Sequence, residues 1–349
     1  MQNPYVELES SAFWRSAVAD RSCFDVSDLW VPKFRFDRMP IYTAGSCFAQ
    51  HFGRALSKAG LRWIDAEQAP TGSSEALKRK FNYGIFSTRT ANIYTTPMLR
   101  QWLELCFTDT RYDEVWETDG RFYDPLRPMI EPNGFASVEE FNEARERTIT
   151  AMRSALEEGC VFVFTLGLTE SWMNKETGMH YAACPGTQAG TFDPKIHVFK
   201  NLSYPETLKN LRASIKLLKK ANKRNKILLT VSPVPLTATA SDDHVLVATT
   251  KSKSILRSVA AAASSDNNGI DYFPSYEIIT GAPFRSMWFE PNMRSVRQEG
   301  VDFVMKNFFR EHEKKFGTLR VPKASGRQIE ENNDDVVCEE VLLEAFGRV

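Results

Sequence analysis

A thiol and a hydroxyl stand together at Cys47 and Ser46, after a short apolar stretch and before an amphipathic helical pattern. If a strand ends at Gly45 and a helix begins directly after it, the unpaired backbone N–H groups of the first helical turn point at one place. The helix dipole there favours a thiolate, and the free N–H groups can form an oxyanion hole. The motif therefore indicates a nucleophile at Cys47, although a structural buried cysteine fits the same pattern.

Candidate acids and bases are few, because the chain has only five histidines. His51 lies one helical turn after Cys47 and on the same helix face, so it could pair with the thiolate or simply face solvent. His244 follows two aspartates that could orient it, or it lies in a surface loop. Glu170 and Glu277 follow apolar stretches, where a buried carboxylate can act as acid or base or only hydrogen-bond the loop backbone.

The elements that must position these residues alternate between strands and helices. Near-continuous apolar stretches predict buried strands at Met39–Ala44, Cys160–Leu166, Ile227–Val231 and Gly269–Phe273. Helical patterns lie at Phe48–Ala59, Val138–Glu157, Tyr204–Asn222, Val245–Ala263 and Val301–Phe309. This alternation predicts an α/β fold with a three-layer, doubly wound parallel sheet.

Small and polar residues follow each predicted strand, and in open α/β sheets ligands bind beyond the carboxyl ends of the strands. We therefore expect one crevice formed by Gly45, Gly167, Thr169, Glu170, Ser232, Ser275, Tyr276 and Glu277. Turn formation alone explains the glycines and serines, but it explains the carboxylates and the thiol less well.

We expect one domain over residues 1–322. Within it, residues 65–132 break the strand–helix rhythm with many aromatics and turns, which predicts an insertion or cap over the sheet edge. Residues 323–349 form a polar, acidic tail that we expect to be loosely held.

Composition excludes several classes of protein. The 44 Lys and Arg balance the 44 Asp and Glu, which argues against a general electrostatic grip on nucleic acid. None of the six cysteines forms a C-x-x-C pair, so we expect no zinc ribbon, and we expect no other metal or cofactor. Widely spaced cysteines, with neither a signal-peptide core nor a membrane-length apolar stretch, predict a cytoplasmic protein.

Eight motifs in order resemble the GSCFA family. They are GSCFA (45–49), NIYT (92–95), DPLRP (124–128), TLGLTESW (165–172), CPGT (184–187), TVSPVP (230–235), HVLVATTKSKSILR (244–257) and DYFPSYEI (271–278). The resemblance spans roughly residues 35 to 310, and the order of so many motifs makes chance implausible.

The family in turn resembles the SGNH/GDSL hydrolases, which implies a flavodoxin-like sheet with the nucleophile just after the first strand. On that resemblance Cys47 takes the nucleophile position, Ser46 the Asp position and Thr169 the position of the Asn that donates to the oxyanion. The chain departs from the pattern because no Asp-x-x-His is present, and the stretch Phe289–Met305 has no histidine at all.

The resemblance implies acyl-ester chemistry, by an esterase or O-acyltransferase, on a sugar-containing or polysaccharide-related substrate. Its partners would be an acylated carbohydrate, or an acyl donor with a carbohydrate acceptor. His244 is the preferred base and His51 the second, while Ser46 is expected to cap the helix. Asn92 is also expected to bind the substrate, and Tyr94, Trp172 and Tyr276 could stack on a sugar ring. The alternative is a catalytically silent protein that binds a glycan or a protein partner in the same crevice.

Overall fold

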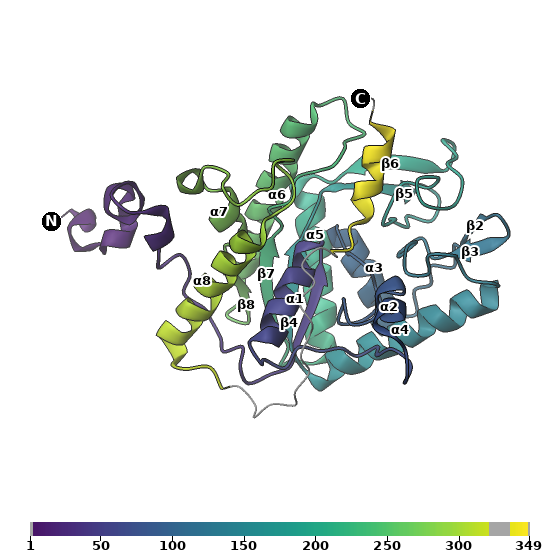
Figure 1. Ribbon diagram of the computed structural model, residues 1–349, viewed down its shortest axis with the longest axis horizontal. Helices are drawn as coiled ribbons and strands as arrows, with labels where there is room; N and C mark the ends of the chain where they lie inside the picture. Colours follow the sequence, from purple (N-terminus) through teal and green to yellow (C-terminus); the bar gives the residue numbers. More distant parts are fainter. Residues whose placement is uncertain (1–2, 321–335, 348–349) are drawn as a thin grey trace.

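The computed structural model describes residues 3–320 and 336–347, and its centre is a parallel sheet of four strands in the order β1-β4-β7-β8 (Figure 1). The strands are β1 (Ile41–Gly45), β4 (Val161–Leu166), β7 (Lys226–Val231) and β8 (Ile270–Tyr272). Gly45 pairs with Thr165 and Leu166 pairs with Val231, so the strands end at one edge. The α/β fold with a parallel sheet is confirmed.

A short parallel bridge lies on the other side of β1. Ile41 pairs with Trp63, the Ile41 N–H donates to Arg62 O at 2.8 Å, and the Ile64 N–H donates to Ile41 O at 2.9 Å. After β1, the chain therefore first runs beside β1 on one side, at Trp63, and later returns to pair with β1 on the other side as β4. In open α/β sheets, ligands bind beyond the strand ends at such a reversal.

Helices cover both faces of the sheet (Figure 1). One face is covered by α1 (Phe48–Lys58), α7 (Ser275–Thr280) and α8 (Gln298–Phe316). The other is covered by α3 (Thr96–Phe107), α4 (Val138–Glu158), α5 (Tyr204–Ala221) and α6 (Val245–Ser265). Alternate strand residues serve the two faces: Phe162 and Phe164 pack with the second set, and Val163 packs with the first.

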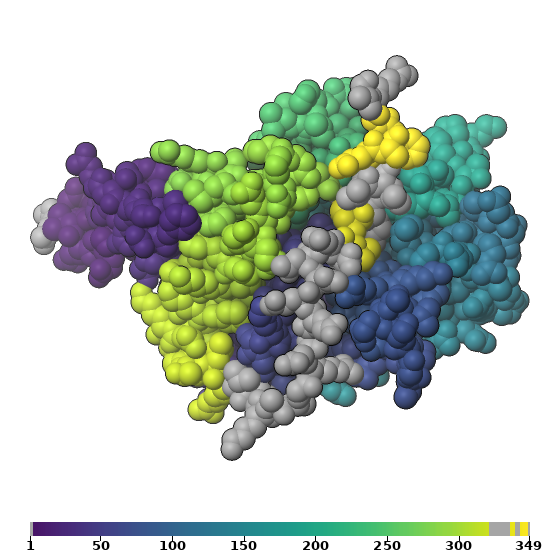
Figure 2. Space-filling model, viewed as in Figure 1, coloured from purple at the N-terminus to yellow at the C-terminus, as the bar shows by residue number. Residues whose placement is uncertain are grey.

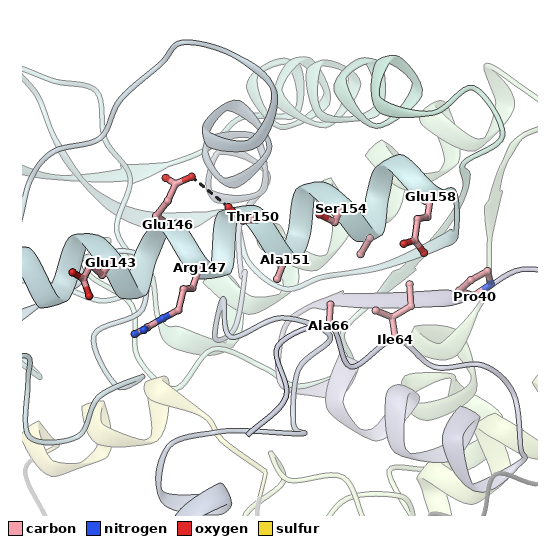
Figure 3. Close-up of a pocket in the computed structure, with 11 residues that line it drawn as sticks. Pro40, Ile64, Ala66, Glu143, Glu146, Arg147, Thr150, Ala151, Ser154 and Glu158 are labelled. Atoms are coloured by element: carbon pink, nitrogen blue, oxygen red, sulfur yellow. Dashed lines mark hydrogen bonds between the residues drawn. The ribbon is translucent and has the colours of Figure 1, made fainter. Parts of the chain in front are cut away.

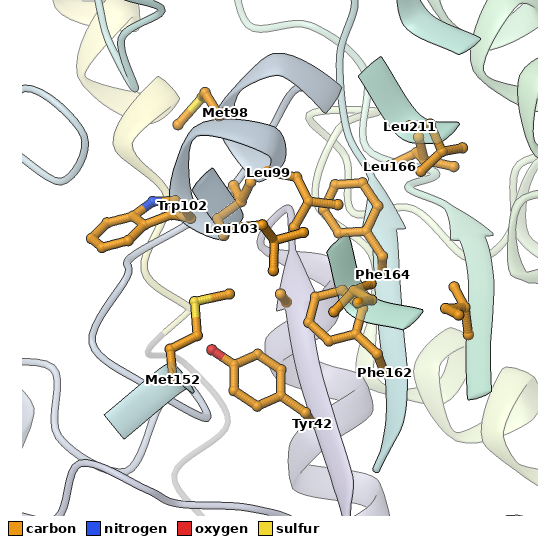
Figure 4. Close-up of a cluster of buried hydrophobic side chains, with 14 of the residues drawn as sticks. Tyr42, Met98, Leu99, Trp102, Leu103, Met152, Phe162, Phe164, Leu166 and Leu211 are labelled. Atoms are coloured by element: carbon orange, nitrogen blue, oxygen red, sulfur yellow. The ribbon is translucent and has the colours of Figure 1, made fainter. Parts of the chain in front are cut away.

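Part of the segment 65–132 belongs to the main core. Met98, Leu99, Trp102 and Leu103 of α3 lie against the sheet face that carries Phe162 and Phe164 (Figure 4). This stretch therefore does more than cover an edge of the sheet.

The other elements are α2 (Glu75–Lys80), the hairpins β2 (Trp116–Thr118) with β3 (Arg121–Tyr123) and β5 (Glu170–Asn174) with β6 (His197–Asn201), and the short helices η1 (Pro4–Glu7), η2 (Ser10–Ala12), η3 (Arg15–Ala19), η4 (Cys23–Asp25), η5 (Ala282–Phe284) and η6 (Glu339–Phe346).

The DPLRP motif forms a buried ionic network rather than a site. Asp124 accepts from Arg127 at 2.9 Å and also pairs with Arg145, while Arg127 donates to Arg89 O and to Thr148, both at 2.6 Å. Burial opposes ionisation of Asp124, but the charges of the two arginines outweigh it and lower the pKa of this carboxyl to about 2. The network ties the loop after β3 to α4.

Within residues 3–320 and 336–347, no helix is both long enough and apolar enough to cross a membrane.

Candidate functional site

The site begins where β1 ends. Gly45 has a φ of 130°, and a Cβ atom there would lie 2.3 Å from Thr165 O, so this position requires glycine. Cys47 is the N-cap of α1, and the predicted cap by Ser46 is wrong. Ser46 still belongs to the strand edge, because its N–H donates to Thr165 O at 3.0 Å. Its buried hydroxyl has no hydrogen-bond partner among the described residues.

Three of the sequence motifs meet at this point. The Ile93 N–H donates to Gly45 O at 2.8 Å, and the Gly167 N–H donates to Tyr94 O at 3.1 Å. A Cβ atom on Gly167 would lie 3.0 Å from Tyr94 O and 3.1 Å from Ser46 Cβ, so a larger residue would have to push these segments apart.

The expectation of a common edge is confirmed for the four marker residues Gly45, Gly167, Ser232 and Ser275. The Ser232 N–H donates to Leu166 O at 2.8 Å, at the end of β4, and the Ser275 hydroxyl donates to Val231 O at 3.2 Å, at the end of β7. Parallel strands bring these residues together because all of them end at the same edge.

Two side-chain amides beside Cys47 bind a single carbonyl oxygen. Gln50 Nε2 donates to Val337 O at 2.7 Å, and Asn92 Nδ2 donates to the same oxygen at 2.8 Å. The Val337 N–H donates in return to Gln50 Oε1 at 3.1 Å, and Gln50 Nε2 also lies 3.0 Å from Asn92 Oδ1. Gln50 and Asn92, which we call the amide pair, are both buried.

The carbonyl belongs to residues 336–347, which we call the C-terminal segment. Its helix η6 is the yellow element in the upper part of Figures 1 and 2, to the right of centre. Its residue Cys338 lies next to the site: the Cys47 thiol donates a hydrogen bond to the Cys338 sulfur. Tyr94 OH lies 3.9 Å and Arg294 Nη2 lies 3.7 Å from the same sulfur.

These contacts favour a thiolate at Cys338. The hydrogen bond from Cys47 lowers the pKa of Cys338, burial opposes it, and the charge and hydrogen bond of Arg294 add to the lowering, so that the pKa is about 5. The described part of the tail therefore lies against the site, whereas the first part of the predicted tail lies outside the described residues.

The two candidate bases differ in their surroundings. His51 is partly buried on α1 with its ring 5.9 Å from that of Phe48, and burial, with the charge of Arg54, lowers its pKa to about 4. His244 is exposed, and its Nδ1 accepts the Leu246 N–H at 3.2 Å, so it is the N-cap of α6. His51 is therefore neutral near neutral pH, while His244 has a structural task at a helix end.

The expected oxyanion donor Thr169 is engaged elsewhere. Its hydroxyl donates to Asn201 Oδ1 at 2.8 Å, and its N–H donates to Ser252 Oγ at 3.0 Å. Glu170 next to it is buried and accepts from Thr239 at 2.9 Å, and burial raises its pKa although that hydrogen bond opposes the shift. Thr169 and Glu170 therefore form a polar cluster with their own partners at the start of β5.

The other residues predicted to contact a substrate have partners within the fold. Glu277 binds Arg257 at 2.5 Å and the Tyr272 hydroxyl at 2.7 Å, and Tyr276 packs against the main core. The Trp172 ring lies 5.3 Å from that of Phe192 and 5.6 Å from that of Phe199. Tyr94 is only 3% exposed, so its ring face is closed to a sugar and only its hydroxyl reaches the site.

A hollow of about 840 Å³ lies elsewhere, between α4 and the residues around β1 (Figure 3). Pro40 at its rim stands before β1, at the opposite end of that strand from Gly45. Its polar lining comes from α4, from Glu143, Glu146, Arg147, Thr150, Ser154 and Glu158. The position of the thiols and the amide pair, rather than the size of this hollow, identifies the candidate site.

No group of three or more His, Cys, Asp or Glu side chains in the described ranges is placed to hold a metal ion.

The sequence analysis did not identify Gln50, Arg294 or Cys338 as site residues. A signal existed only for Gln50, a polar residue three positions after Cys47 on a helix whose buried face is otherwise mostly apolar.

The geometry joins GSCFA, NIYT and TLGL in one place, and the sequence profile of the GSCFA family matches residues 40–308. The chain belongs to the GSCFA family. The GSCFA match contains all four sheet strands and the amide pair, and it ends before the C-terminal segment. The search of curated proteins found no match, and neither did the search of solved structures.

Proposed function

We propose that this GSCFA-family protein transfers acyl groups through Cys47, as an esterase or O-acyltransferase. The observation that carries the proposal is the amide pair, which holds one carbonyl oxygen with two donors at 2.7 and 2.8 Å beside the Cys47 thiol. An acyl substrate presents the same oxygen, and a tetrahedral intermediate would place negative charge on it. The C-terminal segment must leave the amide pair before a substrate can enter.

The thiol has two sources of support as a nucleophile. Cys47 stands at the N-terminus of α1, where the helix dipole favours negative charge. Arg294, from the chain before α8, lies 3.7 Å from the sulfur of Cys338, to which Cys47 donates its hydrogen bond, and so places a positive charge nearby. The thiolate attacks the acyl carbon, the charge passes to the oxygen held by the amide pair, and the departing alkoxide takes up a proton. Water or a hydroxyl acceptor then attacks the thioester and releases Cys47.

The roles of the other residues and the substrate class are also part of the proposal. His51 and His244 are candidates to carry the proton, and Ser46 brings a buried hydroxyl without a partner in the described residues. A sugar-containing substrate is favoured by the likeness to SGNH/GDSL hydrolases, in which the nucleophile also follows the first strand. Trp172 and Tyr276, which are only partly buried, are the aromatic candidates for contact with a sugar ring.

The test is acylation with p-nitrophenyl acetate, followed by tandem mass spectrometry of the peptide that contains both Ser46 and Cys47. We expect one acetyl group on Cys47, removable with neutral hydroxylamine as a thioester is. Cys47→Ser should fold normally and lose most of the labelling. The matched control is Ser46→Ala, which should keep its stability because its hydroxyl has no partner to lose in the described structure. An ester on Ser46 would reverse the assignment.

A second candidate function is a catalytically silent protein that binds a glycan or a protein partner in the crevice. The observation in its favour is that the amide pair already binds both the backbone N–H and the backbone C=O of Val337. Absence of any adduct with several activated donors, together with binding of a glycan or peptide that Gln50→Ala abolishes, would favour this function over catalysis.

A further inference from the structure

We infer that Cys338 and Cys47 form an oxidation site, at which a hydroperoxide converts the two thiols into a disulfide that fastens the C-terminal segment over the crevice. Formation of the disulfide does not depend on the proposed function. Its consequence, that acyl transfer stops until the bond is reduced, rests on that function.

The geometry brings the two sulfurs together by several independent contacts. Cys47 already donates a hydrogen bond to the Cys338 sulfur. The neighbouring residue Val337 is held at both its N–H and its C=O by the amide pair, so the position of Cys338 is set from the backbone. Arg294 and the Tyr94 hydroxyl approach the sulfur from other elements. Neither cysteine is part of a disulfide in the structure.

Three of the other thiols lie in different surroundings. Burial raises the pKa of Cys106 and of Cys160 to about 12, and that of Cys184 to about 11. Hydroperoxides react with thiolates and not with thiols, so reactivity should concentrate at Cys338, which is partly buried and not sealed from solvent.

The reaction proceeds in two steps. The Cys338 thiolate attacks the terminal oxygen of the hydroperoxide, the O–O bond breaks, and with one proton the products are a sulfenic acid and an alcohol, or water from hydrogen peroxide. Cys47, as the thiolate, then attacks the sulfenic sulfur, and hydroxide leaves and is protonated to water. Two electrons pass from the two thiols to the peroxide. A dithiol reductant reverses the change by thiol–disulfide exchange.

Two features of the disulfide would block acyl transfer. Cys47 would be consumed, and the Val337 carbonyl would stay between the two amide donors that a substrate carbonyl needs. In the reduced protein, hydrogen bonds hold the C-terminal segment at the site. In the oxidised protein, the disulfide would hold the same segment there covalently.

The experiment treats the reduced full-length chain with hydrogen peroxide, blocks remaining thiols with an alkylating reagent and maps non-reduced peptides by mass spectrometry. We expect one cross-link, between the peptides of Cys47 and Cys338, formed at least about tenfold faster than Cys184 is oxidised, because an ordinary thiol is only a few per cent ionised at neutral pH. Arg294→Ala should slow the cross-link and Arg294→Lys should largely restore it. Oxidation of Cys338 to sulfinic acid without a cross-link, or cross-links spread evenly over the six cysteines, would refute the inference.

Cys338→Ser separates this inference from the proposed function. The variant should resist peroxide inactivation and still be acylated at Cys47, at the wild-type rate or faster. If the wild-type chain forms the cross-link but neither protein is acylated, the disulfide stands and the acyl-transfer proposal fails. If Cys338→Ser is acylated but is inactivated by peroxide as quickly as the wild type, the oxidation site is refuted and the acyl-transfer proposal stands.

Discussion

Gln50→Ala tests whether the amide pair stabilises the transition state of acyl transfer. The substitution removes one of two donors to the oxygen held beside Cys47, at 2.7 Å in the structure. Removal of one oxyanion donor typically lowers kcat about 100- to 1,000-fold. Because Gln50 also holds the C-terminal segment, its loss should free the crevice, and KM should fall or stay unchanged.

Stability needs a matched control, because Gln50→Ala also removes three hydrogen bonds from Gln50 Nε2 and Oε1. At about 1 kcal/mol for each, the free energy of unfolding should fall by about 2–3 kcal/mol. Gln101 on α3 offers the same arrangement elsewhere: its Nε2 donates to His180 O at 2.8 Å and its Oε1 accepts the His180 N–H at 2.7 Å. Gln101→Ala should lose about 2 kcal/mol of stability but none of the kcat.

The assay is the rate of Cys47 acylation at saturating p-nitrophenyl acetate, together with urea unfolding of both variants. Gln50→Glu is a second variant that keeps an acceptor for the Val337 N–H and loses the donor, and its kcat should fall at least as far. Equal kcat values for Gln50→Ala, Gln101→Ala and the wild type would show that the amide pair only holds the C-terminal segment.

Two further outcomes are expected. Asp124→Asn should lower the free energy of unfolding by about 3–5 kcal/mol near neutral pH, since it leaves two buried arginines unpaired, as urea titration would measure. Because the pKa of Asp124 is lowered to about 2, its contribution is present above about pH 4 and fades as the pH falls towards 2, so the difference from wild type should shrink in acid. His244→Ala should lose about 1 kcal/mol of stability as a lost helix cap. If His244 is also the base, its turnover should fall about 100- to 10,000-fold, and an unchanged rate would limit it to capping.

The sequence by itself determined the architecture of the sheet and the edge at which the site lies. Apolar stretches located all four strands to within a residue or two, and the helical period located α1, α4, α5 and α6 nearly as well. These signals are local, because burial of a strand or of one helix face requires a matching run of apolar side chains. The common edge of Gly45, Gly167, Ser232 and Ser275 then followed from parallel topology.

The Ser46 cap was wrong, and two other residues have partners that the sequence did not indicate, because side-chain direction depends on neighbours. Ser46 fitted the pattern of a helix cap, but its N–H is held by Thr165 on β4, and Cys47 takes the cap position instead. His244, which had the form of a base beside two aspartates, caps α6. Thr169, expected to face the oxyanion, donates its proton to Asn201 on the hairpin partner strand β6.

Only the tertiary structure decided what surrounds Cys47. Gln50 is close in sequence, but Asn92, Arg294 and Cys338 come from separate parts of the chain, and no periodicity relates them. Their convergence depends on the crossing of the chain over β1 and on the packing of the C-terminal segment, both long-range contacts. A local pattern records which face of an element is apolar. It does not record which distant polar group will meet a thiol, because that depends on the packing of the whole fold.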